Sequence, residues 1–341
     1  MKHLARTLCL LWLAPLTAQA VGAPHYHITH QVPLPGDEGW DYLTFEQGGQ
    51  RLFVSHGTRV LVVDTDKLTV VGEIPDTPGV HGIALAPELG RGFVSAGRSG
   101  TVVVFDLKSL ARLKEIKVTG ENPDAILYDP ASQRVFTFNG RGRNATAIDA
   151  RTDEVLGTIP LDAKPEFAAT DGKGRIYVNL EDRNSLAVID PVKLSVVSVW
   201  PVKGCEEPSG LALDASHARL FPVCANKVMP VIDATSGKEL GTAAIGGGPD
   251  AAAFDPGTGL AFASCGEGKL TVVRTSSAGH PEVAESVATQ RGARTMALDL
   301  ARHRVFLVTA DFGPPPAATA TDPHPRPARV PGSFRLLVLE P

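Results

Sequence analysis

The chain has 341 residues, of which 43% are hydrophobic and 21% are charged, as in an ordinary folded protein. Its formal net charge is −4, and no run of Lys and Arg stands out. This argues against a nucleic-acid partner, because affinity for phosphate backbones depends on clustered cations. After the first two dozen residues, no apolar run approaches the roughly 18 residues needed to cross a bilayer. We therefore expect a soluble mature protein without a membrane span.

The first 20 residues have the three parts of a secretory signal peptide. Lys2 and Arg6 give a positive start, residues 8–16 form a short apolar stretch, and residues 18–20 are small enough for cleavage. A second cleavage site follows residue 23. Removal of residues 1–20 leaves 31 basic and 37 acidic residues, a net charge of −6. The pattern predicts export to the periplasm or the medium.

The remaining chain contains seven units of similar sequence. Their first segments recur at intervals of 40, 43, 42, 43, 41 and 44 residues. These segments are GWDYLTF, GVHGIAL, NPDAILY, KPEFAAT, EPSGLAL, GPDAAAF and GARTMAL, and they align on Asp41, His81, Asp124, Glu166, Ser209, Asp250 and Arg294. A second apolar run follows each one: RLFVSH, RGFVSA, RVFTFN, RIYVNL, RLFPVC, LAFASC and RVFLVT. Third and fourth runs complete most units.

These runs are short, rich in Val, Ile and Leu, and bounded by turn residues, which is typical of strands. Four strands in about forty residues indicate a propeller blade. We therefore predict an all-β fold over residues 25–341, a seven-bladed β-propeller of four-stranded antiparallel blades. Blade seven lacks a fourth strand, and residues 25–32 form a strand that no other blade uses. The N-terminal strand is expected to close the ring in the last blade.

The third runs end in two apolar residues and an Asp, as in VVDT, AIDA, VIDP and VIDA. With these repeats the chain resembles the YVTN-repeat propellers, and over residues 25–341 it is similar to the YncE-like exported proteins of bacteria. It departs from the pattern at Arg274 in blade six, which replaces the usual Asp, and in a long insert in blade seven. The resemblance implies the fold and export, and it implies little about chemistry, because propellers carry many functions.

The seven aligned residues begin the innermost strands, so we expect them to surround one mouth of the central channel. His56 and Asn139 end second strands beside them. The plain interpretation is that these polar groups hydrate the mouth. The sharper one is a ligand site, at which Asp41, His81, Asp124 and Asp250 would hold a divalent metal ion if one binds.

Residues 311–332, DFGPPPAATATDPHPRPARVPG, join the second and third strands of blade seven. A loop of this length is uncommon without a role, and its prolines make it extended and stiff. It carries His324, Arg326 and Arg329, and topology puts it on the side of the acidic mouth. It is expected either to act as a flap over the mouth or to be a surface decoration.

Three cysteines remain after cleavage of the leader. Cys205 precedes blade five and Cys224 ends the second strand of that blade, which favours a Cys205–Cys224 disulfide of roughly 3 kcal/mol in the chain-entropy model. Pairing of Cys224 with Cys265, at the equivalent position of the next blade, is the alternative.

Two functions remain open. The favoured one is a periplasmic binding or scaffold protein, whose partner is a small polar or cationic ligand or a periplasmic protein. The other is a metal-assisted lactonase, hydrolase or lyase. In that case His81 or Glu166 would be the general base, and Arg294 would stabilise developing negative charge. The sequence contains no recognisable catalytic motif, which favours the binding protein.

Overall fold

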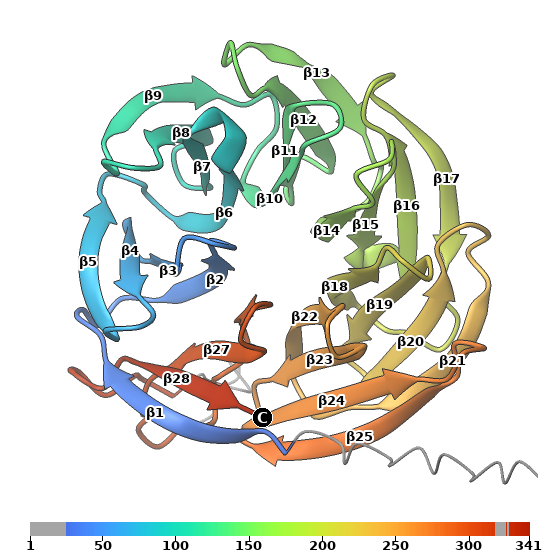
Figure 1. Cartoon of the computed structure of the whole chain (residues 1–341). Helices are drawn as coiled ribbons and strands as arrows, with labels where there is room; N and C mark the ends of the chain where they lie inside the picture. Colours follow the sequence, from blue (N-terminus) through green and yellow to red (C-terminus); the bar gives the residue numbers. More distant parts are fainter. Residues whose placement is uncertain (1–24, 318–324, 326) are drawn as a thin grey trace, which may run out of the picture.

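The computed structural model describes residues 25–317, 325 and 327–341. Seven four-stranded antiparallel sheets are arranged in a ring around a central channel (Figure 1). This confirms the predicted seven-bladed propeller and its count of four strands in every blade. The predicted signal peptide lies outside the described residues.

The strands of each blade follow one another from the channel outwards. Blades one and two contain β2 (Trp40–Phe45), β3 (Arg51–His56), β4 (Arg59–Asp64), β5 (Thr69–Ile74), β6 (Val80–Ala86), β7 (Arg91–Ala96), β8 (Thr101–Asp106) and β9 (Arg112–Lys117). Blades three and four contain β10 (Pro123–Asp129), β11 (Arg134–Asn139), β12 (Asn144–Asp149), β13 (Val155–Pro160), β14 (Pro165–Thr170), β15 (Ile176–Leu180), β16 (Ser185–Asp190) and β17 (Ser195–Pro201).

Blades five and six contain β18 (Pro208–Asp214), β19 (Arg219–Cys224), β20 (Val228–Asp233), β21 (Glu239–Ala244), β22 (Pro249–Asp255), β23 (Leu260–Cys265), β24 (Lys269–Thr275) and β25 (Pro281–Ala288). Blade seven contains β26 (Met296–Asp299), β27 (Arg304–Thr309) and β28 (Arg335–Glu340), followed by β1 (His27–Pro33) at the rim. Two short 3-10 helices, Pro87–Leu89 and Glu181–Arg183, lie in turns.

The hydrophobic core lies between neighbouring blades. The middle strands are buried on both faces because each sheet is sandwiched between two others, and Val102, Val103 and Val104 of β8 are at most 1% exposed. The outer strands face solvent on one side, so in β9 only Ile116 is buried. The short period-two runs of the sequence therefore become strands that differ in burial according to their place in the blade.

The Asp that ends the third strand has a local structural role. The Asp64 carboxylate accepts hydrogen bonds from the backbone N–H groups of Asp66 at 3.0 Å and Lys67 at 2.9 Å, which stabilises the turn into β5. The same arrangement recurs at Asp106, Asp149, Asp190 and Asp233. In blade six, Arg274 instead pairs with Glu282 on the adjoining strand.

The two ends of the chain close the ring together. β1 pairs antiparallel with β28, from His27 opposite Glu340 to Pro33 opposite Arg335. Tyr26, just before β1, is 1% exposed and packs edge-on against Phe262 of blade six. This confirms the predicted closure by the N-terminal strand, which covers the edge of β28 and completes the four strands of blade seven.

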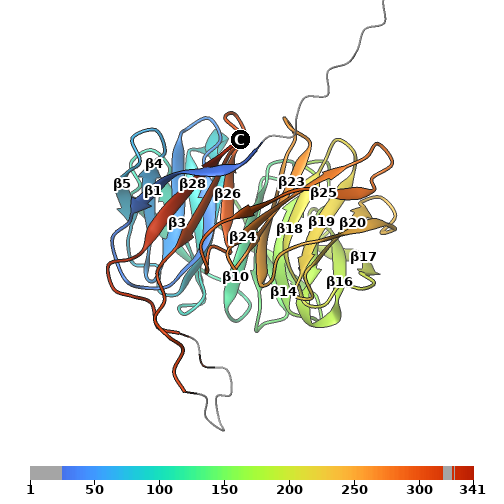
Figure 2. The ribbon, with the colours of Figure 1, turned by 90° about the horizontal axis from the view of Figure 1, so that it is seen from below.

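The chain between β27 and β28 contains the predicted insert, whose described residues lie at one face of the disc, whereas the C-terminus lies at the opposite face (Figure 2). Within the described part of this segment, Phe312 and Arg329 form an antiparallel bridge that holds its two arms together. His324 and Arg326, which the sequence analysis singled out, lie outside the described residues.

Cys205 and Cys224 form a disulfide with a Cα–Cα distance of 5.4 Å, as predicted. The bond joins the loop entering blade five to the end of β19. The alternative pairing with Cys265 is wrong, because Cys265 is a free, buried thiol. Among the described residues, no helix has the length and apolar character needed to cross a membrane.

Candidate functional site

The seven aligned residues occupy equivalent places at one end of the innermost strands. Six of them are the second residue of the first strand of their blade, and Arg294 lies two residues before β26. In the first six blades the pairing of first and second strands is irregular just after this position, as between Trp40 and Leu43. Such bulges bend a strand and redirect a side chain, so the backbone itself presents these residues at the mouth.

Polar side chains of the second strands support this backbone from the preceding blade. Ser95 of β7 donates a hydrogen bond to the carbonyl of Asp124 at 2.5 Å. Asn179 of β15 donates to the carbonyls of Ser209 at 2.7 Å and Gly210 at 3.0 Å. These buried groups hold the mouth residues of one blade against the next, which fixes the spacing of the ring.

The mouth residues form three charged groups. His81 Nδ1 lies 2.6 Å from Asp41 Oδ2 and 3.5 Å from Asp124 Oδ1, so three blades meet at this imidazole. Arg294 Nη1 contacts Asp250 Oδ2 at 2.8 Å.

The third group is centred on a lysine that the sequence analysis did not single out. Lys164 Nζ contacts Glu166 Oε1 at 2.6 Å and also pairs with Glu181. Both additional residues lie in loops at the same end of blade four, outside the aligned position, so the repeat pattern alone does not mark them. Ser209 carries no charge and donates to the Pro249 carbonyl at 3.2 Å.

Crowding of carboxyl groups away from water changes their acidity. Burial raises the pKa values of Asp124 and Asp250 to about 6, and the neighbouring carboxylates add to the effect. Burial and the charge of Asp124 raise the pKa of Glu166 to about 8, against the opposing effect of Lys164. Burial lowers the pKa of His81, but its bond to Asp41 and the nearby carboxylates outweigh this and raise it overall. A cation at the mouth would stabilise the ionised carboxylates.

Below the ring, two aromatic side chains meet across the channel. Tyr42 follows Asp41 in β2, Phe167 follows Glu166 in β14, and their rings stack with centroids 4.5 Å apart. These strands face each other across the central opening (Figure 1). Five blades carry Gly, Ala or Thr at this position. The two aromatic exceptions were therefore visible in the aligned repeats, and together they narrow the channel beneath the carboxylates.

The structure does not bring His56 and Asn139 into the mouth. His56 is fully buried, stacks on Phe334 with centroids 4.4 Å apart, and lies near Glu38. Asn139 is also fully buried and donates hydrogen bonds to Asn144 and Thr146 of its own blade. Both side chains point into the blades because successive residues of a strand face opposite sides, and register decides between them.

Asp41, His81 and Asp124 are the one group of metal-ligand type among the described residues. One ligand atom from each lies within 4.8 Å of the others. Two carboxylates and an imidazole are a donor set that suits zinc or a similar transition metal. Asp250, the fourth residue proposed for a metal, lies outside this group and pairs with Arg294.

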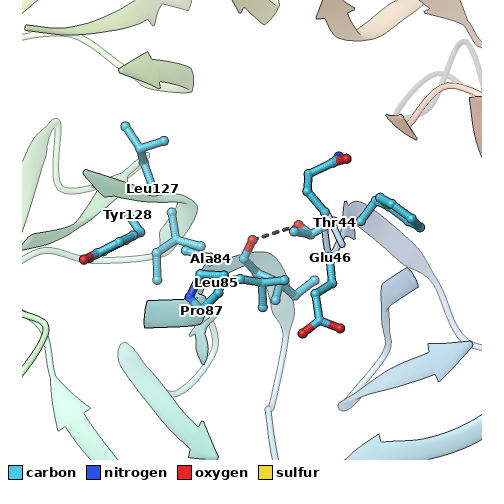
Figure 3. A pocket seen from close by; sticks show the side chains of 11 residues that line it. Thr44, Glu46, Ala84, Leu85, Pro87, Leu127 and Tyr128 are labelled. Carbon is cyan, nitrogen blue, oxygen red and sulfur yellow. Dashed lines mark hydrogen bonds between the residues drawn. The ribbon is translucent and has the colours of Figure 1, made fainter. Parts of the chain in front are cut away.

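Two cavities adjoin the ring on the mouth side. One, of about 700 Å³, is lined by His81, Glu121 and Asn122 together with the basic side chains of Arg98, Lys117 and Arg141. The other, of about 450 Å³, is lined by Arg294, Trp40 and residues of the blade-seven insert. A third, of about 300 Å³, lies where the first strands end, at the opposite face (Figure 3). Its wall is largely apolar, and Thr44 closes one side with a hydrogen bond to the Ile83 carbonyl.

The known proteins that resemble this chain share its fold, at low sequence identity. No protein-family model matches the chain, and no curated protein matches its sequence. A chain in the crystal structure of a mitotic checkpoint complex is similar to 96% of this chain, with a TM-score of 0.73, 13% identity and 99% of its own length covered. A chain of Kuenenia stuttgartiensis hydrazine synthase is similar over 94%, with a TM-score of 0.69, 17% identity and 100% of its length covered. At these identities the likeness establishes a β-propeller and carries no activity with it.

Proposed function

We propose that this chain is an exported YncE-like propeller of the bacterial periplasm, which binds a small cationic or polar ligand at its acidic mouth. The observation that carries the proposal is the excess of carboxylates over cations at the ring. Asp41, Asp124, Glu166 and Asp250 come from four blades, and Glu181 adds a fifth carboxylate. The cations at the ring are Lys164, Arg294 and, when it is protonated, His81.

Two properties of the mouth favour binding of a ligand over simple hydration. The Asp124 and Glu166 side chains are only 17% and 16% exposed, so water screens an ionised carboxylate there poorly, and a bound cation would favour the ionised form of both groups. The aromatic pair of Tyr42 and Phe167 narrows the channel below them and gives the mouth an apolar floor. A cation with a short apolar body would contact both.

The disulfide between Cys205 and Cys224 supports the exported location, because such bonds persist in oxidising compartments. The predicted leader peptide points the same way. A periplasmic protein could bind in the same way, by placing a Lys or Arg side chain in the mouth.

Calorimetric titration with putrescine, a small diamine, tests the mouth directly. We expect saturable binding at pH 7.5 that weakens by about tenfold or more in an Asp124→Asn/Asp250→Asn variant, the loss expected for a charge-assisted contact. The matched control is Asp66→Asn/Glu115→Gln, which removes two carboxylates from exposed surface pairs. Equal weakening of putrescine binding in both variants would mean that the net charge of the protein, and not the mouth, causes the loss. Unchanged affinity in Asp124→Asn/Asp250→Asn would mean that putrescine binds elsewhere.

The metal-assisted enzyme is the second candidate, and the grouping of Asp41, His81 and Asp124 is the observation in its favour. Asp41 contacts Nδ1 of His81, which leaves Nε2 to accept a proton. A β-carbon at Gly97 would lie 2.8 Å from that Nε2, so glycine keeps this edge of the ring accessible from the larger cavity. A bound divalent ion would polarise a substrate carbonyl.

The other proposed catalytic residues are separately paired. Glu166 contacts Lys164, and Arg294 contacts Asp250, so neither is joined to His81 by a hydrogen bond among the described residues. Metal analysis of protein purified without chelators decides between the candidates. Near-stoichiometric metal that is lost in Asp41→Asn/Asp124→Asn, together with turnover of lactones or esters, would favour the enzyme, and metal-free inactive protein would favour the binding protein.

A further inference from the structure

Described residues of the blade-seven insert line a cavity of opposite charge beside the acidic mouth. This cavity, which we call the insert cavity, has a volume of about 450 Å³. Its side chains come from blade one, from the loop before β26 and from the two arms of the insert: Trp40, Arg291, Arg294, Phe312, Pro327 and Arg329. Glycine backbone from blades six and seven completes the wall.

Two cation–π contacts between an arginine and an aromatic ring form its sides. The Arg291 guanidinium lies 5.9 Å from the centre of the Phe312 ring, and the Arg329 guanidinium lies 5.8 Å from that of Trp40. The two rings are 6.4 Å apart and tilted by 54°. A guanidinium group that contacts an aromatic ring in this way can still donate hydrogen bonds to a carboxylate or phosphate.

The position of Phe312 depends on a specific glycine. Gly292 has a φ of +85°, and a β-carbon there would lie 2.6 Å from the Phe312 ring. Any other residue at position 292 would both strain the backbone and displace the ring. The left-handed backbone of Gly292, without a side chain, therefore leaves the space that the Phe312 ring of the insert occupies.

Two of the three arginines of the cavity have no acidic partner among the described residues. Across the part of the chain that the structure describes, neither Arg291 nor Arg329 has a carboxylate within 4.0 Å, and Arg329 donates only to the Asp37 carbonyl at 3.3 Å. Arg294 is shared with Asp250, so the cavity opens beside the ring. Three guanidinium groups and two aromatic rings around this volume form a polar and aromatic lining of the kind that binds small molecules.

We propose that the insert cavity binds a small aromatic anion, a planar ring that carries a carboxylate or a phosphate group. The ring of the ligand would pack against Trp40 and Phe312, and its anionic group would accept hydrogen bonds from Arg291 and Arg329. This goes beyond the proposed function, because the ligand has the opposite charge to that expected at the acidic mouth and uses different residues.

Tryptophan fluorescence offers a direct measurement. The chain has three Trp, and a full-length Trp12→Phe/Trp200→Phe background keeps Trp40 as the reporter in the cavity wall. We expect saturable quenching by benzoate and by phenyl phosphate, and the stronger of the two identifies the anionic group. Acetate lacks the ring and benzyl alcohol lacks the charge, so each should bind at least about tenfold more weakly.

Variants then locate the site, with saturation-transfer NMR of the probes as a readout that does not depend on Trp40. Arg291→Gln/Arg329→Gln should weaken benzoate binding by about tenfold or more, the loss expected for charged hydrogen bonds. Arg98→Gln/Arg141→Gln, which alters the other basic cavity, should leave it unchanged. Asp124→Asn should also leave it unchanged, so this site can fail or succeed independently of the acidic mouth.

The proposal is wrong if neither aromatic anion binds at millimolar concentration to protein whose thermal unfolding is normal. It is also wrong if benzyl alcohol or acetate binds as tightly as benzoate, because the site would then not recognise the charge or the ring, respectively. Equal weakening by the two arginine pairs would mean attraction to the whole basic face, and would overturn the assignment to the insert cavity.

Discussion

Asp124 and Asp214 both have carboxyl groups that are mostly shielded from solvent, but their surroundings shift their pKa values in opposite directions. Asp214 ends β18, and its carboxylate accepts hydrogen bonds from the Ser216 and His217 backbone. Burial acts to raise the pKa of Asp214, but hydrogen bonds from the Ser216 hydroxyl and from the ring and backbone of His217 outweigh it and lower the pKa. Asp124 has the ring carboxylates around it and a more distant His81, so burial dominates and its pKa rises to about 6.

This difference predicts opposite effects on stability. Asp124 holds its proton more tightly in the folded protein than in the unfolded chain, so its ionisation destabilises the fold as pH rises from about 4 to above 6. We expect Asp124→Asn to raise the free energy of unfolding at pH 7.5, by up to about 3 kcal/mol, and the gain to vanish near pH 4.

Asp214→Asn is the matched control with the reverse sign. Its lowered pKa means that ionisation stabilises the fold, a contribution present at neutral pH and lost as pH falls through the folded value. The substitution should therefore destabilise at pH 7.5. Urea unfolding of both variants at pH 7.5 and pH 4.5 checks the pair, and destabilisation by Asp124→Asn at pH 7.5 would show that its charge is favourably compensated.

At the scale of strands, an arginine at the start of several second strands joins neighbouring blades. Arg219 opens β19 and donates to the Thr275 hydroxyl at 2.9 Å and the Ser276 carbonyl at 3.1 Å, both in the next blade. Arg91, Arg134 and Arg304 make equivalent contacts. The repeated Arg of the second apolar runs thus has a structural role. It donates hydrogen bonds to carbonyls in the turn that follows the third strand of the next blade.

Loss of one such contact should be costly because the carbonyls and the arginine are shielded from water. We expect Arg219→Gln to lower the free energy of unfolding by about 2–4 kcal/mol. Arg274→Gln, which breaks an exposed pair with Glu282, should change it by less than about 0.5 kcal/mol. Urea denaturation of both variants measures the difference, and equal effects would mean that the contact between blades contributes little.

At the scale of the whole molecule, the ring is held closed by non-covalent pairing in one blade. β1 covers the edge of β28. Tyr26 extends the contact into blade six, where its ring packs on Phe262 and its backbone N–H donates a hydrogen bond to Glu285 Oε2 at 3.0 Å. In a closed ring every blade supports two neighbours, so a defect in blade seven exposes core on both sides.

Deletion of residues 25–33 should therefore destabilise the entire propeller. A loss of about 3 kcal/mol or more would lower Tm by roughly 6–12 °C, and the open β28 edge would promote aggregation. The control moves the same residues behind Pro341 through a short Gly-rich turn, since His27 pairs with Glu340 and a hairpin can connect them. Recovery of Tm in this permutant would attribute the effect to ring closure, and an unchanged Tm after deletion would contradict it.

The sequence by itself determined the architecture, because blades are local units. Four strands and their turns lie within about forty consecutive residues, so period-two runs, turn residues and the repeat of the ring position predict the blade without tertiary information. The unmatched strand at residues 25–32 and the short last blade likewise predicted the closure, and the positions of Cys205 and Cys224 in one blade predicted the disulfide.

Only the tertiary structure decided how the mouth is organised. Contacts such as His81 with Asp41 and Asp124, or Tyr42 with Phe167, join residues from different blades, whose relative rotation and depth no local pattern encodes. His56 turned inwards because one residue of register reverses the facing of a strand. Within a blade, consecutive strands pair with one another and therefore follow the chain, whereas a binding site in the ring arises where seven separate blades converge.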